Sequence, residues 1–70
     1  MSKPTIDMPT VYAAIARHDH TGLREAARYM GIDRKTFYGY MNGSTPRLDT
    51  ACKIADYCEC GLDDLVRWPR

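Results

Sequence analysis

The feature that most constrains the fold is the spacing of small and turn-forming residues within residues 23–43. Ala27 provides a small side chain at a point where two helices can meet at a steep angle. Gly31 follows four residues later, where a chain leaving a helix often adopts a positive φ, which costs glycine least. Asp33 is suited to cap the next helix, because its carboxylate accepts hydrogen bonds from the unpaired amides of the first turn. This spacing predicts two short helices joined by a tight turn.

Hydrophobic periodicity along the rest of the chain predicts an all-α domain and no β-strand. The predicted helices cover residues 8–19, from 22 or 23 to 30, 34–41, a fourth segment after the loop 42–46, and 62–67. Residues 1–7 have no periodicity and are predicted to form a flexible N-terminal arm. The folded part would then be one domain of residues 8–68, since a chain of 70 residues can bury only one modest core.

The same periodicity identifies which side chains should face that core. The expected inward positions are Val11, Ala14, Ile15 and His18 in the first helix, Phe37, Tyr40 and Met41 in the third, and Leu48, Cys52, Ala55 and Cys58 in the fourth.

Charge is distributed unevenly, although the net charge is only +1. From Arg17 to Arg47, six basic residues stand against three acidic ones, whereas from Leu48 to Val66 one basic residue stands against five acidic ones. A domain polarised in this way can present a basic face to phosphates and keep its acidic end away from them.

The turn-forming pattern lies within a longer resemblance. The residues that carry it are Ala27, Gly31, Phe37 and Tyr40, followed by Asn42 and Gly43. Their arrangement resembles the helix-turn-helix of the lambda-repressor and Cro family of phage and bacterial regulators. The downstream segment PRLDTACKIADYCECGLDDLVRW resembles the fourth and fifth helices of that family, except that Glu59 replaces the usual glycine after the fourth helix. The resemblance covers roughly residues 9–68 and implies a compact five-helix, lambda-repressor-like domain with the helix-turn-helix at its second and third helices.

This resemblance implies sequence-specific binding of a double-stranded DNA operator, with the third helix in the major groove. The residues expected to contact bases are Arg34, Lys35, Thr36, Tyr38 and Gly39. Arg34 is the leading candidate for specificity, because arginine can donate two hydrogen bonds to guanine O6 and N7. Thr36 has the alternative of bonding only within its own helical turn, and Tyr38 that of partial burial. Gly39 would let the backbone approach the DNA closely.

Phosphate contacts are expected on both sides of the third helix. The resemblance places Asn42, Ser44 and Arg47 in or beside the loop that follows this helix, where the family binds a phosphate. Arg24, near the start of the second helix, would act from the other side. The chain departs from the family at Leu23, where many relatives carry a glutamine that braces both the third helix and the phosphate.

The last predicted helix has an apolar face that we interpret as the interface of a homodimer. Its residues are Leu62, Leu65 and Val66, with Trp68 beyond them. Two copies are expected because one such module contacts few base pairs. The alternative for Trp68 is that it caps the core.

The resulting functional hypothesis is a transcriptional regulator, a repressor of the Cro type from a phage or prophage. The competing hypothesis is a protein-interaction module of the same fold, as in an antitoxin or antirepressor. An apolar third helix would have favoured that alternative, whereas the exposed positions of this helix are basic.

Other functional classes find little support in the residues. Cys52, Cys58 and Cys60 lack the Cys-x-x-Cys spacing of ordinary zinc sites, and we expect reduced, buried thiols with no metal or cofactor. His18 and His20 could sense pH or touch phosphate, but a histidine near a helix C-terminus also complements the helix dipole. No catalytic constellation, small-molecule site, signal peptide or membrane segment is evident, so a non-enzymatic protein of the bacterial cytoplasm or nucleoid is expected.

Overall fold

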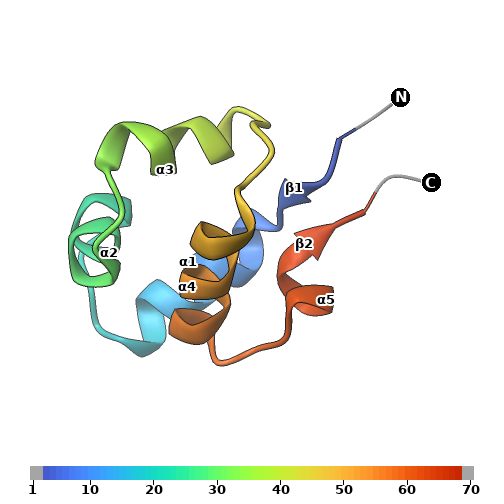
Figure 1. Cartoon of the computed structure of the whole chain (residues 1–70). Coiled ribbons are helices and arrows are strands. Elements are labelled where there is room, and N and C mark those ends of the chain that lie inside the picture. Colours follow the sequence, from blue (N-terminus) through green and yellow to red (C-terminus); the bar gives the residue numbers. More distant parts are fainter. Residues whose placement is uncertain (1–2, 69–70) are drawn as a thin grey trace.

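Five helices and a two-stranded sheet make up residues 3–68, the part of the chain that the computed structural model describes (Figure 1). In chain order the elements are β1 (Thr5–Ile6), α1 (Met8–Arg17), α2 (Leu23–Met30), α3 (Arg34–Met41), α4 (Leu48–Cys58), α5 (Leu62–Leu65) and β2 (Val66–Arg67). The predicted five-helix, predominantly α-helical fold is confirmed.

The turn between α2 and α3 has the geometry expected from the sequence. Gly31 lies in the left-handed region with φ of 74°, and the Ile32 N–H donates to the carbonyl oxygen of Ala27 at 2.9 Å. Asp33 caps α3, because its Oδ2 accepts a hydrogen bond of 3.2 Å from the Thr36 N–H. Both ends of the turn are therefore fixed by local chemistry.

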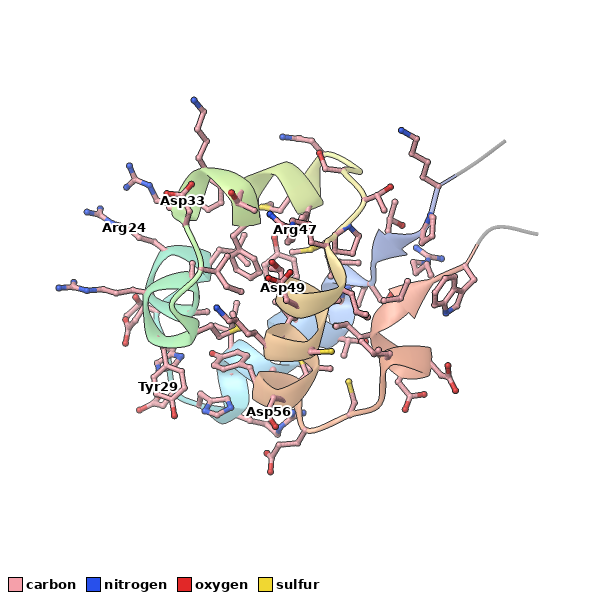
Figure 2. All side chains as sticks on the ribbon, viewed as in Figure 1. Arg24, Tyr29, Asp33, Arg47, Asp49 and Asp56 are labelled. Atoms are coloured by element: carbon pink, nitrogen blue, oxygen red, sulfur yellow. The ribbon has the colours of Figure 1, made fainter. Side chains whose placement is uncertain are left out.

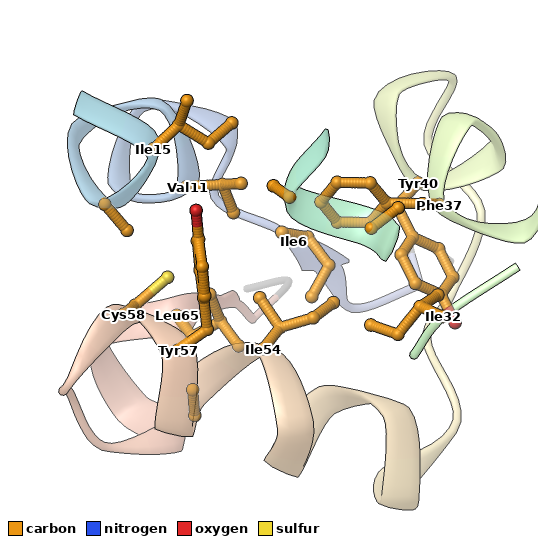
Figure 3. Packing of buried hydrophobic residues seen from close by; sticks show 14 of the residues in the cluster. Ile6, Val11, Ile15, Ile32, Phe37, Tyr40, Ile54, Tyr57, Cys58 and Leu65 are labelled. Atoms are coloured by element: carbon orange, nitrogen blue, oxygen red, sulfur yellow. The ribbon is translucent and has the colours of Figure 1, made fainter. Parts of the chain in front are cut away.

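One apolar core connects all five helices, and α4 packs against α1, α2 and α5. The largest fully buried side chains are Val11, Phe37, Ile54 and Leu65, which come from four different helices. Figure 3 shows Ile54 of α4 between the α1 side of this core and the rings contributed by α3. Because α2 and α3 also contact each other, the core holds α3 at a fixed angle to the rest of the domain.

The expectation of no strand is wrong. Ile6 pairs with Val66 and Thr5 with Arg67 in an antiparallel sheet, and the Asp7 N–H donates to the Leu65 carbonyl oxygen at 2.7 Å. Two residues per strand are too few to produce a periodic pattern, although three of the four are β-branched. Ile6 is only 3% exposed, so residues 5–7 belong to the fold rather than to a flexible arm. Residues 1–2 lie outside the described part of the chain.

Pairing with β1 also shortens the last helix. The helix predicted over residues 62–67 ends at Leu65, and Val66 is extended, with φ of −102° and ψ of 128°. Val66 turns its side chain into the core and is 7% exposed. At the other end of the chain, α1 stops at Arg17 instead of Asp19, which has a positive φ of 57°.

The predicted inward faces of α3 and α4 are partly wrong. Met41 is 45% exposed, Leu48 is 72% exposed, and Cys52 is also exposed. The buried residues of α4 are Ala51, Ile54, Ala55, Tyr57 and Cys58. The apolar stripe of α4 therefore begins at Ala51. Leu48 and Cys52, which were predicted to face inward, lie beside this stripe.

Glu59 occupies a backbone conformation that favours glycine. It follows α4 with φ of 55° and ψ of 43°, which is the left-handed region that glycine adopts most easily. A left-handed conformation costs a non-glycine residue about 1–2 kcal/mol, partly offset because glycine loses more backbone entropy on folding. We expect Glu59→Gly to raise the free energy of unfolding by about 0.5–1 kcal/mol, measured by urea denaturation. Glu59→Ala removes the same charge without relieving the backbone, and an equal gain in this control would contradict the explanation.

Candidate nucleic-acid interface

The outer face of α3 consists of exposed polar and basic side chains. Phe37 and Tyr40 point into the core and are 0% and 4% exposed, so the helix presents its other face to solvent. Arg34, Lys35 and Thr36 are exposed in its first turn. The N-terminal turn of α3, stabilised by Asp33, thus carries two positive charges outward.

The side chains of Thr36 and Tyr38 are both accessible, and their contacts with DNA stay predictions. Thr36 bonds Asp33 through its backbone N–H, which leaves its exposed side chain available for a DNA contact. Tyr38 is 39% exposed, so partial burial and a contact with DNA are compatible.

Gly39 faces the loop that follows α3. A Cβ atom at this position would lie 3.4 Å from the Ser44 Oγ. The Gly39 carbonyl oxygen accepts hydrogen bonds from the N–H groups of Asn42 and Ser44, at 3.0 and 3.1 Å. Glycine at this position therefore allows the loop to fold back on the helix, while its predicted close approach to DNA is untested.

The four predicted phosphate-binding side chains are exposed and lie on two sides of α3. Arg24 extends from α2, whereas Asn42, Ser44 and Arg47 belong to the loop between α3 and α4. Figure 2 shows Arg24 directed outward from α2, with Arg47 near the start of α4. The Arg47 Nε lies 3.7 Å from the Asp49 Oδ1, but both side chains are more than 70% exposed. Such a surface ion pair contributes little and leaves Arg47 able to exchange partners.

The departure at Leu23 changes how α2 begins. Leu23 packs partly buried against the core, and the N-cap residue Gly22 has no side chain with which to cap the helix. Instead, the N–H and the hydroxyl of Thr21 donate to the Glu25 Oε2, at 3.2 and 2.7 Å. These hydrogen bonds lower the pKa of Glu25, which is therefore ionised at neutral pH.

The predicted dimer face needs correction. Leu65 is 0% and Val66 is 7% exposed, because both side chains complete the core under the β1–β2 sheet. Leu62 is partly buried, whereas Trp68 is 61% exposed and does not cap the core. An apolar cavity of about 210 Å³ lies beside Trp68. Its lining residues are Pro4, Thr45, Pro46, Leu48, Ala51, Leu62, Val66 and Trp68.

Of the three thiols, only Cys58 is fully buried. Burial raises the pKa of Cys58 to about 11 and also raises that of Cys60, so both are protonated at neutral pH. Cys52 is exposed, which contradicts the expectation of three buried thiols. Within residues 3–68, no three or more histidine, cysteine, aspartate and glutamate side chains are grouped to hold a metal ion.

His18, predicted on the inward face of α1, is partly buried, and together with His20 it has a structural role. The His18 Nε2 donates to the Tyr57 carbonyl oxygen at 2.8 Å, and the His20 Nδ1 lies 2.6 Å from the Tyr57 Oη. The rings of His18 and Tyr57 are stacked with centroids 4.1 Å apart. The connection between α1 and α2 is thus tied to α4, and α2 is held in place.

A short α2, a left-handed Gly31 and a capped α3 with a basic outer face together define a helix-turn-helix domain. A family model described as the Cro/C1-type HTH DNA-binding domain matches residues 15–70, and the chain belongs to this family. The protein is therefore a DNA-binding transcription regulator of a family that is typically non-enzymatic. No curated protein and no solved structure gives a significant match. Among the described residues, no helix has the length and apolar character needed to span a bilayer.

Proposed function

We propose that the protein is a Cro-type repressor of a phage or prophage that binds a specific operator with α3 in the major groove. The observation that carries this proposal is the exposed first turn of α3, where Arg34 and Lys35 project from a helix whose N-terminus is fixed by Asp33. In this docking geometry the N-terminal residues of the helix meet the base edges. Arg34 would bind guanine, with Lys35, Thr36 and Tyr38 at neighbouring bases and the Gly39 backbone close to the groove.

Phosphate binding on both sides of α3 would set its register. Arg24 would bind one strand from α2, while Asn42, Ser44 and Arg47 would bind the other from the loop after α3. The hydrogen bonds that the Asn42 and Ser44 N–H groups donate to the Gly39 carbonyl oxygen order this loop and support its part of the proposal. Such a protein acts where its operator lies, in the bacterial cytoplasm or nucleoid.

We propose further that the repressor is a homodimer that binds two half-sites about 34 Å apart. The surface we assign to the second copy is the apolar cavity beside Trp68, rimmed by Pro46, Leu48 and Leu62. No charged side chain lines it, and Trp68 and Leu48 are 61% and 72% exposed beside it. Tryptophan in an apolar patch is typical of the centre of a protein interface.

Trp68→Ala is expected to shift the protein from dimer to monomer, with a loss of about 2 kcal/mol or more in association free energy, measured by sedimentation equilibrium. Tyr12→Ala is the matched control, since Tyr12 is 47% exposed but lies on α1. Equal association of Trp68→Ala and the unchanged protein would show that the interface lies elsewhere.

DNA binding itself is tested by titrating the unchanged protein with random duplex DNA at several salt concentrations. We expect affinity to fall steeply as salt rises, because bound phosphates release counterions. If protein that is folded by circular dichroism fails to bind at low salt, the repressor proposal is wrong and a protein partner, as for an antitoxin, becomes the better hypothesis.

A further inference from the structure

Three arginines from two helices line one shallow cleft on the basic side of the domain. The cleft has a volume of about 480 Å³ and lies between α2 and the start of α3. Arg24 and Arg28 contribute from α2 and Arg34 from α3, with Ala27 and Ile32 as apolar lining. Arg24 and Arg28 are four residues apart, so they share one face of α2. No acidic side chain lines the cleft.

The nearest acidic residue on α2 is held by other groups. Glu25 accepts two hydrogen bonds from Thr21, which draw its carboxylate toward the N-terminus of the helix. Within the described part of the chain, no carboxylate lies within salt-bridge distance of Arg24, Arg28 or Arg34. No ion pair among the described residues therefore neutralises the three arginines, although the Glu25 carboxylate, which lines the neighbouring cavity with Arg24 and Arg28, attracts Arg28 at longer range.

We infer that this cleft is a binding site for a phosphodiester of the DNA backbone, and that Arg28 is one of its ligands. Arginine suits such a site because its planar guanidinium donates two parallel hydrogen bonds to a phosphate. The N-terminus of α3 adds little to this site, because the Asp33 carboxylate already caps it. Arg34 also belongs to the outer face of α3, so it connects the phosphate site to the major groove.

This inference rests on the proposed DNA binding and extends it. The phosphate contact of α2 becomes a site built from two residues one turn apart, Arg24 and Arg28, instead of Arg24 alone. Leu23 cannot make the phosphate contact expected of a glutamine at this position, and the two arginines would replace that contact by their charge. Arg28 should strengthen binding to all sequences alike, because a phosphate contact carries no base information.

The test compares Arg28→Ala with Lys53→Ala in binding to random duplex DNA over a range of salt concentrations. Both variants lose one positive charge, but Lys53 lies on α4 and lines different cavities, with Tyr57 and with Cys60. We expect Arg28→Ala to lower the slope of log affinity against log salt by about 0.9, and affinity at 0.1 M salt by about tenfold. Lys53→Ala should leave the slope close to that of the unchanged protein, and Arg28→Lys should retain most of it.

Three other outcomes would count against the inference. If Arg28→Ala and Lys53→Ala behave alike while the unchanged protein binds DNA, the assignment of Arg28 is wrong and the proposed function stands. If the unchanged, folded protein does not bind duplex at all, the proposed function fails and the cleft assignment fails with it. If inorganic phosphate, titrated at constant ionic strength, saturates the arginine NMR signals of the cleft at sub-millimolar concentration, the cleft is a site for a free anion.

Discussion

Replacement of Phe37 with alanine is expected to lower the free energy of unfolding by about 3–5 kcal/mol. Phe37 is 0% exposed, and its ring packs edge-on against Tyr40 with centroids 6.5 Å apart (Figure 3). Truncation of a buried phenylalanine costs about 3–5 kcal/mol, through lost transfer free energy and the cavity that remains. A domain of 70 residues has roughly 4–10 kcal/mol of total stability, so this loss is comparable to the whole at the lower end. Urea denaturation followed by circular dichroism measures the change.

The neighbouring residue provides the control for this prediction. Tyr38→Ala removes a side chain of similar size that is 39% exposed, and we expect it to cost about 1 kcal/mol or less. Phe37→Leu keeps most of the buried volume and should remain folded with a smaller loss. If Phe37→Ala were as stable as Tyr38→Ala, α3 would not be anchored through this ring, and the fixed angle of α3 on the domain would need another explanation.

The helix-turn-helix was predictable because local chemistry determines it. Gly31 adopts the left-handed conformation and Asp33 caps α3, and both effects depend on residues within one helical turn. The burial of Phe37 and Tyr40 follows from helical periodicity. The exposure of Arg34 and Lys35 follows from the same pattern, because residues on the opposite side of a helix from its buried face lie in solvent.

The C-terminal end was mispredicted because a distant segment determines it. Val66 would continue a helix by its pattern, but it pairs with Ile6 at the other end of the chain. That pairing buries Val66 and Leu65 and removes them from the proposed dimer surface. A pairing of two residues with two leaves no periodic signal, so only the tertiary structure reveals it.

The arginine cleft was also beyond local patterns. Arg28 and Arg34 are separated by the turn, and their presence in one cleft depends on the angle between α2 and α3. The tie of His18 and His20 to Tyr57 of α4 contributes to holding α2 in place. Whether a side chain is buried or exposed on its own helix could be predicted from the sequence. Which side chains from two helices meet in one cleft could not.

The double variant Arg34→Ala, Lys35→Ala is expected to bind random duplex DNA about a hundredfold more weakly than the unchanged protein at 0.1 M salt. On random duplex, where no specific base contact forms, each of these side chains would neutralise about one phosphate, and each lost phosphate contact lowers the salt slope by about 0.9. The slope should therefore fall by nearly two. Both side chains are exposed in the first turn of α3, so the fold should change little. Fluorescence anisotropy with a labelled duplex, repeated at several salt concentrations, measures both quantities.

A second double variant separates contact from overall charge. Lys53→Ala, Arg67→Ala also removes two positive charges, but from α4 and β2, and should reduce affinity only by weakening the long-range attraction. Its salt slope should stay close to that of the unchanged protein, because no counterion-releasing contact is lost. If both double variants lost affinity and slope equally, the DNA would be attracted by net charge, and α3 would have no special part in binding.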